Sequence, residues 1–378
     1  MKILITVGIY PPDIGGPASF VPKIAEKLIE NKFEVSVICL TEKKETDTTE
    51  YPVIRILRKQ NLILRWVKTV STIIKHGKNA DIIFVNGLPM EAFVANILLR
   101  KKLVRKIVGD WAWERGRNKG IIDESFDEFQ SNSHNFHLEI AKFSRGWTAA
   151  KANIVITPSI HLKKVVEKWG VNKSSIKVIY NGTLITENSK KKTQKDILNI
   201  ITVGRLAPWK NIDVIIKSMS LIKQKGLQFH LYVIGSGPQE NELKNLVKRL
   251  DLMEQVTFTG QKSTSELEKY YLKSDIYIQA SAYEGLPHVL LEAINYNLFV
   301  ISTPIGGSNE ILENGNNGWV LNLENGIKPD EKEIKYLVYE ILNNPKLANQ
   351  KKQNSKFILE EKFNEEENFS KYLELFKE

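Results

Sequence analysis

The feature that most constrains this chain is a pattern that runs through it twice. Short runs rich in Val, Ile and Leu alternate with amphipathic stretches of helical length. Continuous apolar strands separated by helices are typical of a parallel sheet that is covered on both faces. In the first half the pattern predicts strands over residues 2–7, 34–40, 53–56, 81–85, 105–108, 154–157 and 177–179. It predicts helices over residues 17–31, 61–76, 90–100 and 160–169.

The alternation lapses over residues 109–153, a length that in a compact domain usually has a function. It restarts after a polar stretch, residues 186–195, which has the composition of a linker. There we expect strands over 197–203, 228–234, 255–259, 276–279 and 299–302, and helices over 211–225, 240–250, 263–273 and 288–296. The sequence therefore predicts an α/β protein of two doubly wound, Rossmann-like domains, residues 1–182 and 183–361. Ligands of such sheets bind at the carboxyl ends of the strands, here between the domains.

The composition narrows the class of protein further. With 378 residues, 42% hydrophobic and 26% charged, the chain is long enough for two folded domains and is neither disordered nor collagen-like. The only cysteine, Cys39, excludes an intramolecular disulfide and a thiolate zinc cluster, and fits a reducing compartment. No apolar run reaches the roughly 18 residues of a membrane span, and the first residues read as a strand, not a signal peptide. We therefore expect a cytoplasmic protein.

The net charge of +10 is concentrated in the first half of the chain. Residues 1–180 hold 29 Lys and Arg against 18 Asp and Glu, whereas residues 181–378 hold 25 against 26. This excess suggests an anionic partner, such as a membrane surface or a phosphorylated substrate, with a merely soluble lysine-rich surface as the alternative. Nucleic acid is not an expected partner, because the chain has no base-stacking module or arginine-rich motif.

One basic stretch, residues 58–68, also contains Leu62, Leu64, Trp66 and Val67. A helix that lies on an anionic membrane has this composition. The apolar positions do not form one stripe, so a partly buried ordinary helix is an equally good interpretation. On the first interpretation the protein binds peripherally to the inner face of the membrane.

The strongest motif is Glu284-Gly285-Leu286-Pro287-His288-Val289-Leu290-Leu291-Glu292, just after the predicted strand 276–279. Pro287 suits the first position of a helix. The start of that helix would offer backbone N–H groups, including those of Val289 and Leu290, to a phosphate. Glu284 and Glu292 could both reach hydroxyl groups of one bound ligand.

A second motif, Gly204-Arg205-Leu206-Ala207-Pro208-Trp209-Lys210-Asn211, follows the predicted strand 197–203. Arg205 and Lys210 suit a diphosphate, the arginine as a fork and the lysine as a point charge. An ordinary connection with exposed basic residues is the alternative.

Glycine pairs mark three further turns, at Gly15-Gly16, Gly235-Ser236-Gly237 and Gly306-Gly307. The first lets the backbone approach a ligand, and the third places backbone amides near one. The second is better explained as a purely structural turn. The first turn is not a dinucleotide fingerprint, because no G-x-G-x-x-G follows the first strand.

In their order along the chain, Gly15-Gly16, Gly204-Arg205…Lys210, Glu284-x7-Glu292 and Gly306-Gly307-x-x-Glu310 resemble the motifs of glycosyltransferase family 4. The resemblance covers nearly the whole chain. Members of this family are retaining enzymes with the GT-B fold, in which two Rossmann-like domains face each other across a deep cleft. The resemblance implies a nucleotide-sugar donor held mainly by the second domain and an acceptor held by the first. It also implies that the last helix, about residues 362–378, packs back on the first domain.

The same resemblance implies roles for individual residues. Arg205 and Lys210 would bind the donor diphosphate, Glu292 would bind the ribose hydroxyls, and Glu284 would face the sugar as a catalytic residue. Further donor contacts would come from Gly16, Gly260, Gln261, Gly285, Leu286, Pro287, Val289 and Leu290. No metal and no other cofactor is expected, because basic residues and a helix N-terminus would neutralise the leaving diphosphate.

One position departs from the family pattern. Family members often carry a histidine after the fifth strand, and here Gly109 stands at that place. Asp110 is the nearest ionisable group, so we consider it as a catalytic residue, with a turn or helix cap as the alternative. Trp111 and Trp113 beside it could present their rings to an acceptor sugar.

The leading hypothesis is a retaining glycosyltransferase. It would move a hexose-type sugar from a UDP- or GDP-sugar to a saccharide or lipid-linked saccharide in cell-surface glycan biosynthesis. The alternatives are a nucleotide-sugar epimerase or hydrolase on the same fold, and a non-enzymatic nucleic-acid-binding protein. Turnover of the donor without an acceptor would favour the epimerase or hydrolase. A salt-sensitive mobility shift with RNA or DNA would favour the nucleic-acid-binding protein.

Overall fold

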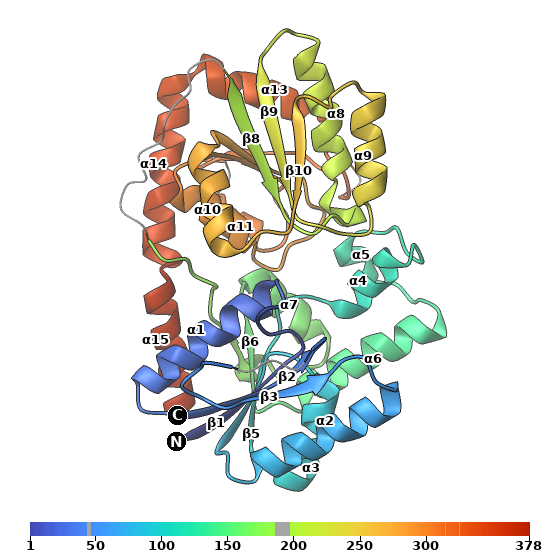
Figure 1. Cartoon of the computed structure of the whole chain (residues 1–378), viewed down its shortest axis with the longest axis vertical. Helices are drawn as coiled ribbons and strands as arrows, with labels where there is room; N and C mark the ends of the chain where they lie inside the picture. Colours follow the sequence, from blue (N-terminus) through green and yellow to red (C-terminus); the bar gives the residue numbers. More distant parts are fainter. Residues whose placement is uncertain (44–46, 186–196, 314, 325) are drawn as a thin grey trace.

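The computed structural model describes residues 1–43, 47–185, 197–313, 315–324 and 326–378, which form two α/β domains (Figure 1). The expected linker, residues 186–195, lies outside the described residues. The sheet of the first domain is parallel throughout, in the order β3-β2-β1-β4-β5-β6-β7. Its strands are β1 (Lys2–Val7), β2 (Glu34–Thr41), β3 (Val53–Leu57), β4 (Ile82–Val85), β5 (Lys102–Lys106), β6 (Ile154–Thr157) and β7 (Ile176–Val178).

The second sheet is also parallel, in the order β10-β9-β8-β11-β12-β13. Its strands are β8 (Leu198–Val203), β9 (Phe229–Ile234), β10 (Val256–Gly260), β11 (Ile276–Gln279), β12 (Phe299–Ser302) and β13 (Trp319–Val320). In both sheets the strand order reverses beside the first strand, which is the topology of a doubly wound sheet. The predicted fold class, two Rossmann-like doubly wound domains in the GT-B arrangement, is confirmed.

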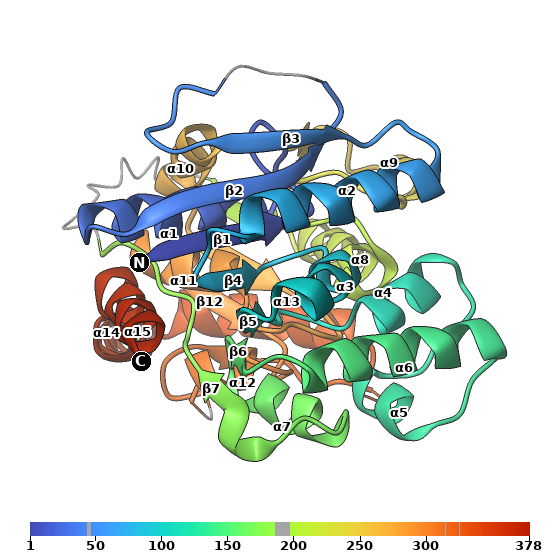
Figure 2. The same ribbon diagram turned by 90° about the horizontal axis from the view of Figure 1, so that it is seen from below.

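Apolar helix faces cover both sides of the first sheet. Val21 and Ile24 of α1 (Gly16–Glu30) pack on one face, together with Phe369 and Phe376 of the last helix, α15 (Glu365–Lys377). The other face carries α2 (Leu62–Gly77), α3 (Pro89–Leu99), α4 (Trp111–Asn118), α5 (Phe126–Ser131), α6 (Phe136–Ala150) and α7 (Ile160–Lys168). The view from below shows α2, α3 and α6 side by side on this flank (Figure 2).

The second sheet is covered in the same way. One core contains residues of α8 (Ile212–Lys223), α9 (Glu240–Arg249) and α13 (Glu331–Asn343). The other contains residues of α10 (Thr264–Lys273), α11 (His288–Asn295), α12 (Ser308–Ile311) and α14 (Pro345–Lys362). Short 3-10 turns, η1 (Lys173–Ser175) and η2 (Pro208–Lys210), precede β7 and α8. Figure 1 shows α14 running along the second domain and α15 continuing beside the first.

The structure differs from the prediction at β5, which spans Lys102–Lys106 and not residues 105–108. Arg105 and Lys106 in this strand are buried, although charged residues rarely are. Arg105 donates a hydrogen bond to Thr148 Oγ1 at 2.6 Å, and Lys106 donates one to Asn181 Oδ1 at 3.1 Å. These partners allow a basic strand inside the core, which an apolar pattern does not reveal.

The segment 109–153 folds into α4, α5 and α6, which the sequence analysis did not predict. Each helix begins at a capping side chain: Asp110, Ser125 and Asn135. Figure 1 shows α4 and α5 reaching from the first domain to the second. There Trp113 and Phe126 pack against Tyr283, with ring centroids 5.4 and 3.7 Å away. The segment therefore joins the two domains through buried aromatic side chains.

A carboxylate forms a second junction. Glu310 of α12, in the second domain, accepts the backbone N–H groups of Ile160 and His161, each at 2.9 Å. These are the first residues of α7 in the first domain. The Tyr180 hydroxyl donates to the same carboxylate at 2.9 Å. Glu310 therefore caps a helix of the other domain, where the helix dipole favours a negative charge.

Candidate active site between the two domains

Two predicted motifs from distant parts of the chain meet at the carboxyl edge of the second sheet. Lys210, after β8, places its Nζ 2.5 Å from Oε1 of Glu284, which follows β11. Ser281 donates a second hydrogen bond to this oxygen at 2.7 Å. The Lys210 and Glu284 side chains are only 16% and 13% exposed, whereas Arg205 on the same loop is exposed. Residues that the sequence analysis assigns to the diphosphate and to the sugar therefore lie in direct contact.

Glycines hold the loops of this edge against each other. A Cβ on Gly235, which has a φ of +131°, would lie 1.9 Å from the carbonyl oxygen of Gly204. A Cβ on Gly306, with a φ of +50°, would lie 1.9 Å from the carbonyl oxygen of Glu284. The N–H of Gly307 donates to that same carbonyl at 3.1 Å. The Gly235 turn is structural, as the sequence indicates, and the Gly306 turn supports the backbone of Glu284.

The start of α11 lies beside the pair and against the first domain. Pro287 is the N-cap and not the first helical residue. Leu290 N–H donates to the Pro287 carbonyl at 3.1 Å, so of the two predicted phosphate donors Val289 is the one in the open first turn. A Cβ on Gly285 would lie 2.1 Å from the carbonyl oxygen of Val108 in the first domain. The predicted phosphate-binding turn is therefore placed at the domain boundary.

Glu292 lies one turn further along α11. Its Oε2 accepts a hydrogen bond from the Tyr271 hydroxyl at 2.9 Å. Burial raises the pKa of Glu292, while the Tyr271 hydrogen bond and the charge of Lys23 lower it. The carboxylate is thus largely withdrawn from water, with one oxygen held by a phenol.

The other predicted donor residues are spread around this edge. Gly260 ends β10 with a φ of +69°, and its carbonyl accepts the N–H of Gly235 at 3.0 Å. Gln261 beside it is exposed, and the Leu286 side chain is buried in a core, so Leu286 offers only its backbone. Gly16 begins α1 in the first domain, and a Cβ there would meet nothing within 4 Å. None of the contacts among the described residues joins Gly16 to Lys210 or Glu284.

Asp110, the tentative catalytic residue, is a helix cap. Its Oδ1 accepts the N–H groups of Ala112 and Trp113, at 3.0 and 3.4 Å. Its Oδ2 accepts Gln130 Nε2 at 3.0 Å and forms an ion pair with Arg145. The side chain has no exposed surface. The cap alternative is confirmed. Both oxygens are already bound inside the first domain, so the geometry gives the catalytic interpretation no support.

The two tryptophans proposed for the acceptor differ in position. Trp113 is fully buried, with its ring centroid 5.5 Å from that of Trp209, so it cannot present its ring to an acceptor sugar. Trp111 is 40% exposed. It lines a surface pocket of about 430 Å³ between α4 and α6, together with Arg115 and His137. Trp111 therefore keeps its place as a candidate acceptor contact, and Trp113 is a packing residue.

Two polar groups that sequence reasoning missed lie beside the Lys210–Glu284 pair. One is Glu114 of α4: burial raises its pKa, while the charges of Lys210 and Arg205 lower it. The other is the hydroxyl of Tyr283, next to Glu284 in the chain. One feature of the sequence could have pointed to Glu114: it lies on the first helix after β5. The carboxyl ends of the parallel strands of a sheet lie at one edge, where ligands bind, so residues just after such a strand are candidates for the site.

A half-buried histidine, His288, also lies at the start of α11. Burial, together with the charges of Lys106 and Lys23, lowers the pKa of His288 to about 3. Burial likewise lowers the pKa of Lys106, whose Nζ lies 3.2 Å from the centre of the Phe20 ring. Without a bound anion, the His288 imidazole is therefore neutral at physiological pH.

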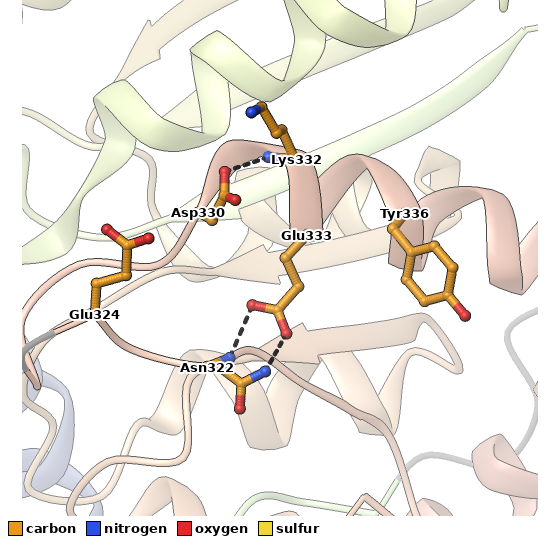
Figure 3. Close-up of a pocket in the computed structure, with 6 residues that line it drawn as sticks. All are labelled: Asn322, Glu324, Asp330, Lys332, Glu333 and Tyr336. Atoms are coloured by element: carbon orange, nitrogen blue, oxygen red, sulfur yellow. Dashed lines mark hydrogen bonds between the residues drawn. The ribbon is translucent and has the colours of Figure 1, made fainter.

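A pocket of about 450 Å³ elsewhere in the second domain is lined by Asn322, Glu324, Asp330, Lys332, Glu333 and Tyr336 (Figure 3). Some of its polar groups bind one another: Glu333 accepts two hydrogen bonds from Asn322, and Asp330 caps α13. None of the predicted site residues lines it. Within the described ranges, no group of three or more His, Cys, Asp or Glu side chains is arranged to hold a metal ion.

Two family models match the chain, one for each domain. The model described as Glycosyltransferase Family 4 matches residues 14–185. The model described as Glycosyl transferases group 1 matches residues 184–357. Together the two matches extend over nearly the whole chain and include both predicted loops, at Arg205 and at Glu284.

Individual relatives and solved structures agree with these models. An uncharacterised glycosyltransferase of Haemophilus influenzae is 31% identical over 196 residues, covering 52% of this chain and 53% of that protein, so the chain spans about half of its length. A Campylobacter jejuni N-acetylgalactosamine-N,N'-diacetylbacillosaminyl-diphospho-undecaprenol 4-alpha-N-acetylgalactosaminyltransferase is 23% identical, covering 84% of this chain and 86% of that protein. The crystal structure of Anabaena HepE in complex with UDP and glucose has a TM-score of 0.79, with 18% identity over 100% of this chain and 99% of that one.

Proposed function

The chain belongs to the glycosyltransferases of group 1 and family 4, and on this basis we propose that it transfers a hexose-type sugar from a UDP- or GDP-sugar. The acceptor is a saccharide or lipid-linked saccharide, and the product is part of a cell-surface glycan. The configuration at the transferred carbon is retained. Two relatives support this choice by their names: HepE was crystallised with UDP and glucose, and the Campylobacter enzyme is named for a diphospho-undecaprenol-linked substrate.

The observation that carries the proposal is the Lys210–Glu284 pair beside the start of α11, with Arg205 exposed on the same loop as Lys210. As the bond between sugar and diphosphate breaks, negative charge grows on the diphosphate. Two cations and open N–H groups at a helix N-terminus stabilise that charge more strongly than they stabilise the ground state. The same charge neutralisation removes the need for a metal ion, so we propose a metal-independent reaction.

The remaining chemistry is a matter of position. The acceptor hydroxyl attacks the sugar carbon on the face from which the diphosphate leaves, and the leaving phosphate takes the hydroxyl proton. The C–O bond to phosphate breaks with its electron pair on the phosphate, while a new C–O bond forms to the acceptor. The protein holds the acceptor hydroxyl on the same face of the sugar as the leaving diphosphate and neutralises the charge.

The surface of the first domain supports a lipid-linked acceptor. Leu62, Ile63 and Leu64, at the start of α2, are 69%, 73% and 66% exposed, and Arg65 and Lys68 follow in the same helix. The second half of α2, not this end, contributes the buried residues of the helix. Each Lys or Arg near an anionic bilayer contributes about 1 kcal/mol. We therefore propose that this end of α2 rests on the anionic inner face of a membrane. In the described ranges of the chain, every helix falls short of the length or apolarity that a membrane span needs.

Transfer itself is tested with purified protein, a panel of UDP- and GDP-hexoses, and saccharide and lipid-linked acceptors. We expect one nucleotide sugar to support sugar incorporation, equal rates with and without EDTA, and an anomeric coupling constant in the product that matches the donor. Release of nucleoside diphosphate without incorporation into any acceptor would contradict the proposal and favour a hydrolase.

The membrane surface is tested by co-sedimentation with vesicles. We expect more protein with anionic than with neutral vesicles at low salt, and a loss of most binding when Leu62, Ile63 and Leu64 are all replaced by Gln. Met253→Gln is the control, because Met253 is 62% exposed in the second domain. Equal recovery of the natural protein with neutral and anionic vesicles would contradict the proposed binding to an anionic membrane.

A further inference from the structure

Glu114 is a carboxylate at the domain boundary without a partner among the residues that the structure describes. Its helix, α4, is fixed at one end by the Asp110 cap and along its length by the burial of Trp113. The Glu114 backbone N–H closes the first turn by donating to the Asp110 carbonyl at 3.0 Å. No hydrogen bond or ion pair to its carboxylate occurs among the described residues, although burial raises its pKa. A rigid helix therefore holds an unpaired acceptor group in place.

The carboxylate lies in the space that a side chain at position 109 would need. A Cβ on Gly109 would lie 3.1 Å from Glu114 Oε1, which is tighter than an ordinary contact, and 3.8 Å from the Tyr283 hydroxyl. Gly109 has no positive φ, so the backbone there would accept another residue. A side chain at position 109 would therefore crowd the Glu114 carboxylate.

The charges that act on Glu114 come from the candidate donor site. Lys210 and Arg205 lower its pKa, and Glu284 raises it. Lys210 is already paired with Glu284 at 2.5 Å, and Ser281 also binds Glu284. Glu114 therefore lies opposite Lys210, Glu284 and Ser281, on the first domain, and takes no part in the hydrogen bonds among these three residues.

The Tyr283 hydroxyl is a second group in need of a partner. Tyr283 is only 5% exposed, and its hydroxyl has no hydrogen-bond partner in the part of the chain that the structure describes. The oxygen would lie 3.8 Å from a Cβ on Gly109 and 3.8 Å from a Cβ on Gly285. It thus lies between the loop that precedes Glu114 and the loop that carries Glu284. A buried hydroxyl without a partner is costly, which points to a polar ligand at this place.

We propose that Glu114 and the Tyr283 hydroxyl bind one sugar hydroxyl at the reacting centre. Glu114 accepts a hydrogen bond from it, and Tyr283 donates one to it. A carboxylate and a phenol together match both the donor and the acceptor of a hydroxyl group. Since Glu114 comes from the domain opposite Arg205 and Lys210, we assign the hydroxyl to the acceptor saccharide. This inference rests on the proposed function.

The test compares Glu114→Gln with Tyr283→Phe and with Asn118→Ala, a change at an exposed position of the same helix. We expect Glu114→Gln to lower kcat/KM for the acceptor by about 10- to 100-fold, since a hydrogen bond to a charged group is lost. The affinity for the nucleoside diphosphate should stay within about twofold. Tyr283→Phe should act in the same direction, and Asn118→Ala should have no effect.

Two other outcomes are distinct. A loss of affinity for the nucleotide sugar, with unchanged affinity for the nucleoside diphosphate and an unchanged KM for the acceptor, would move the hydroxyl to the donor sugar and overturn our assignment. Equal kcat/KM values for Glu114→Gln and the natural protein would overturn the role of Glu114 altogether. Neither result affects the proposed function, which fails only if the natural protein itself transfers no sugar.

A second measurement is independent of activity. Gly109→Ala should lower the thermal stability of the natural protein, because its Cβ meets Glu114 Oε1 at 3.1 Å. It should lower stability less when Glu114 is already replaced by Ala, since the space is then free. Strictly additive effects in this double-mutant cycle would show that the carboxylate does not occupy the space at Gly109.

Discussion

At the scale of the residue, the two glutamates of the Glu284-x7-Glu292 motif occupy different surroundings. Glu284 pairs with Lys210, whereas Glu292 lies further into α11 and is held by the Tyr271 hydroxyl. If Glu292 binds the ribose, Glu292→Ala should weaken binding of a free nucleoside diphosphate by about tenfold. Glu284→Gln should leave that affinity within about twofold and reduce transfer. Calorimetric titration with nucleoside diphosphate and with nucleotide sugar separates the two roles, and unchanged nucleotide affinity in Glu292→Ala would end the ribose assignment.

The pKa of Glu292 predicts how stability depends on pH. Burial raises this pKa above its ordinary value of 4.5, so the folded protein binds the proton more tightly than the unfolded chain does. The stabilisation from the protonated carboxyl is present at low pH and is lost as the pH rises through the raised pKa. Glu292→Gln should therefore gain stability relative to the natural protein as the pH rises above 4.5, because only the natural side chain has a proton to lose there. Urea unfolding at several pH values measures this difference, and a constant difference across the range would contradict it.

At the scale of the element, Glu310 links α12 of the second domain to the start of α7 in the first. It caps the Ile160 and His161 N–H groups and also accepts the Tyr180 hydroxyl. Glu310→Ala should cost about 1 to 2 kcal/mol in the free energy of unfolding, because two N–H groups in the first turn of α7 lose their acceptor. Tyr180→Phe, which removes one of the three bonds, should cost less. Unfolding midpoints in urea measure both, and a midpoint of Glu310→Ala equal to that of the natural protein would exclude a stabilising junction.

The helices and strands also show how much of the structure could be predicted from the sequence. Strands 2–7, 154–157, 276–279 and 299–302 have the predicted bounds, because each is a continuous apolar run in a buried parallel sheet. Strand β5 was misplaced since its buried Arg105 and Lys106 look like surface residues until their partners, far away in the chain, are known. Asp110 was likewise a candidate catalytic residue in the sequence, with a helix cap as the alternative, and the structure shows that it caps α4. Glu114 belongs to none of the predicted motifs, and only its place on the first helix after β5 could have pointed to it.

At the scale of the whole molecule, the closeness of the two domains depends on Gly285. A Cβ there would lie 2.1 Å from the Val108 carbonyl of the first domain, while the backbone of Gly285 itself has no positive φ. Gly285→Ala should therefore hold the domains further apart without unfolding either of them. We expect a larger radius of gyration in solution scattering and a loss of transfer of at least about tenfold, since misplacement by 1 Å can cost far more. An unchanged radius together with full activity would contradict the need for this contact.

The central claim is that the carboxyl edge of the second sheet binds and activates a nucleotide-sugar donor through Arg205 and Lys210. The most direct measurement is sugar transfer by the double variant Arg205→Ala/Lys210→Ala, compared with Lys223→Ala/Lys244→Ala, which removes two lysines that pair with Asp251 and Glu240 outside the site. Circular dichroism and thermal unfolding verify that both variants are folded. The account predicts that the first variant remains folded and loses transfer, while the second retains it. A folded Arg205→Ala/Lys210→Ala protein with unchanged specific activity would contradict the account.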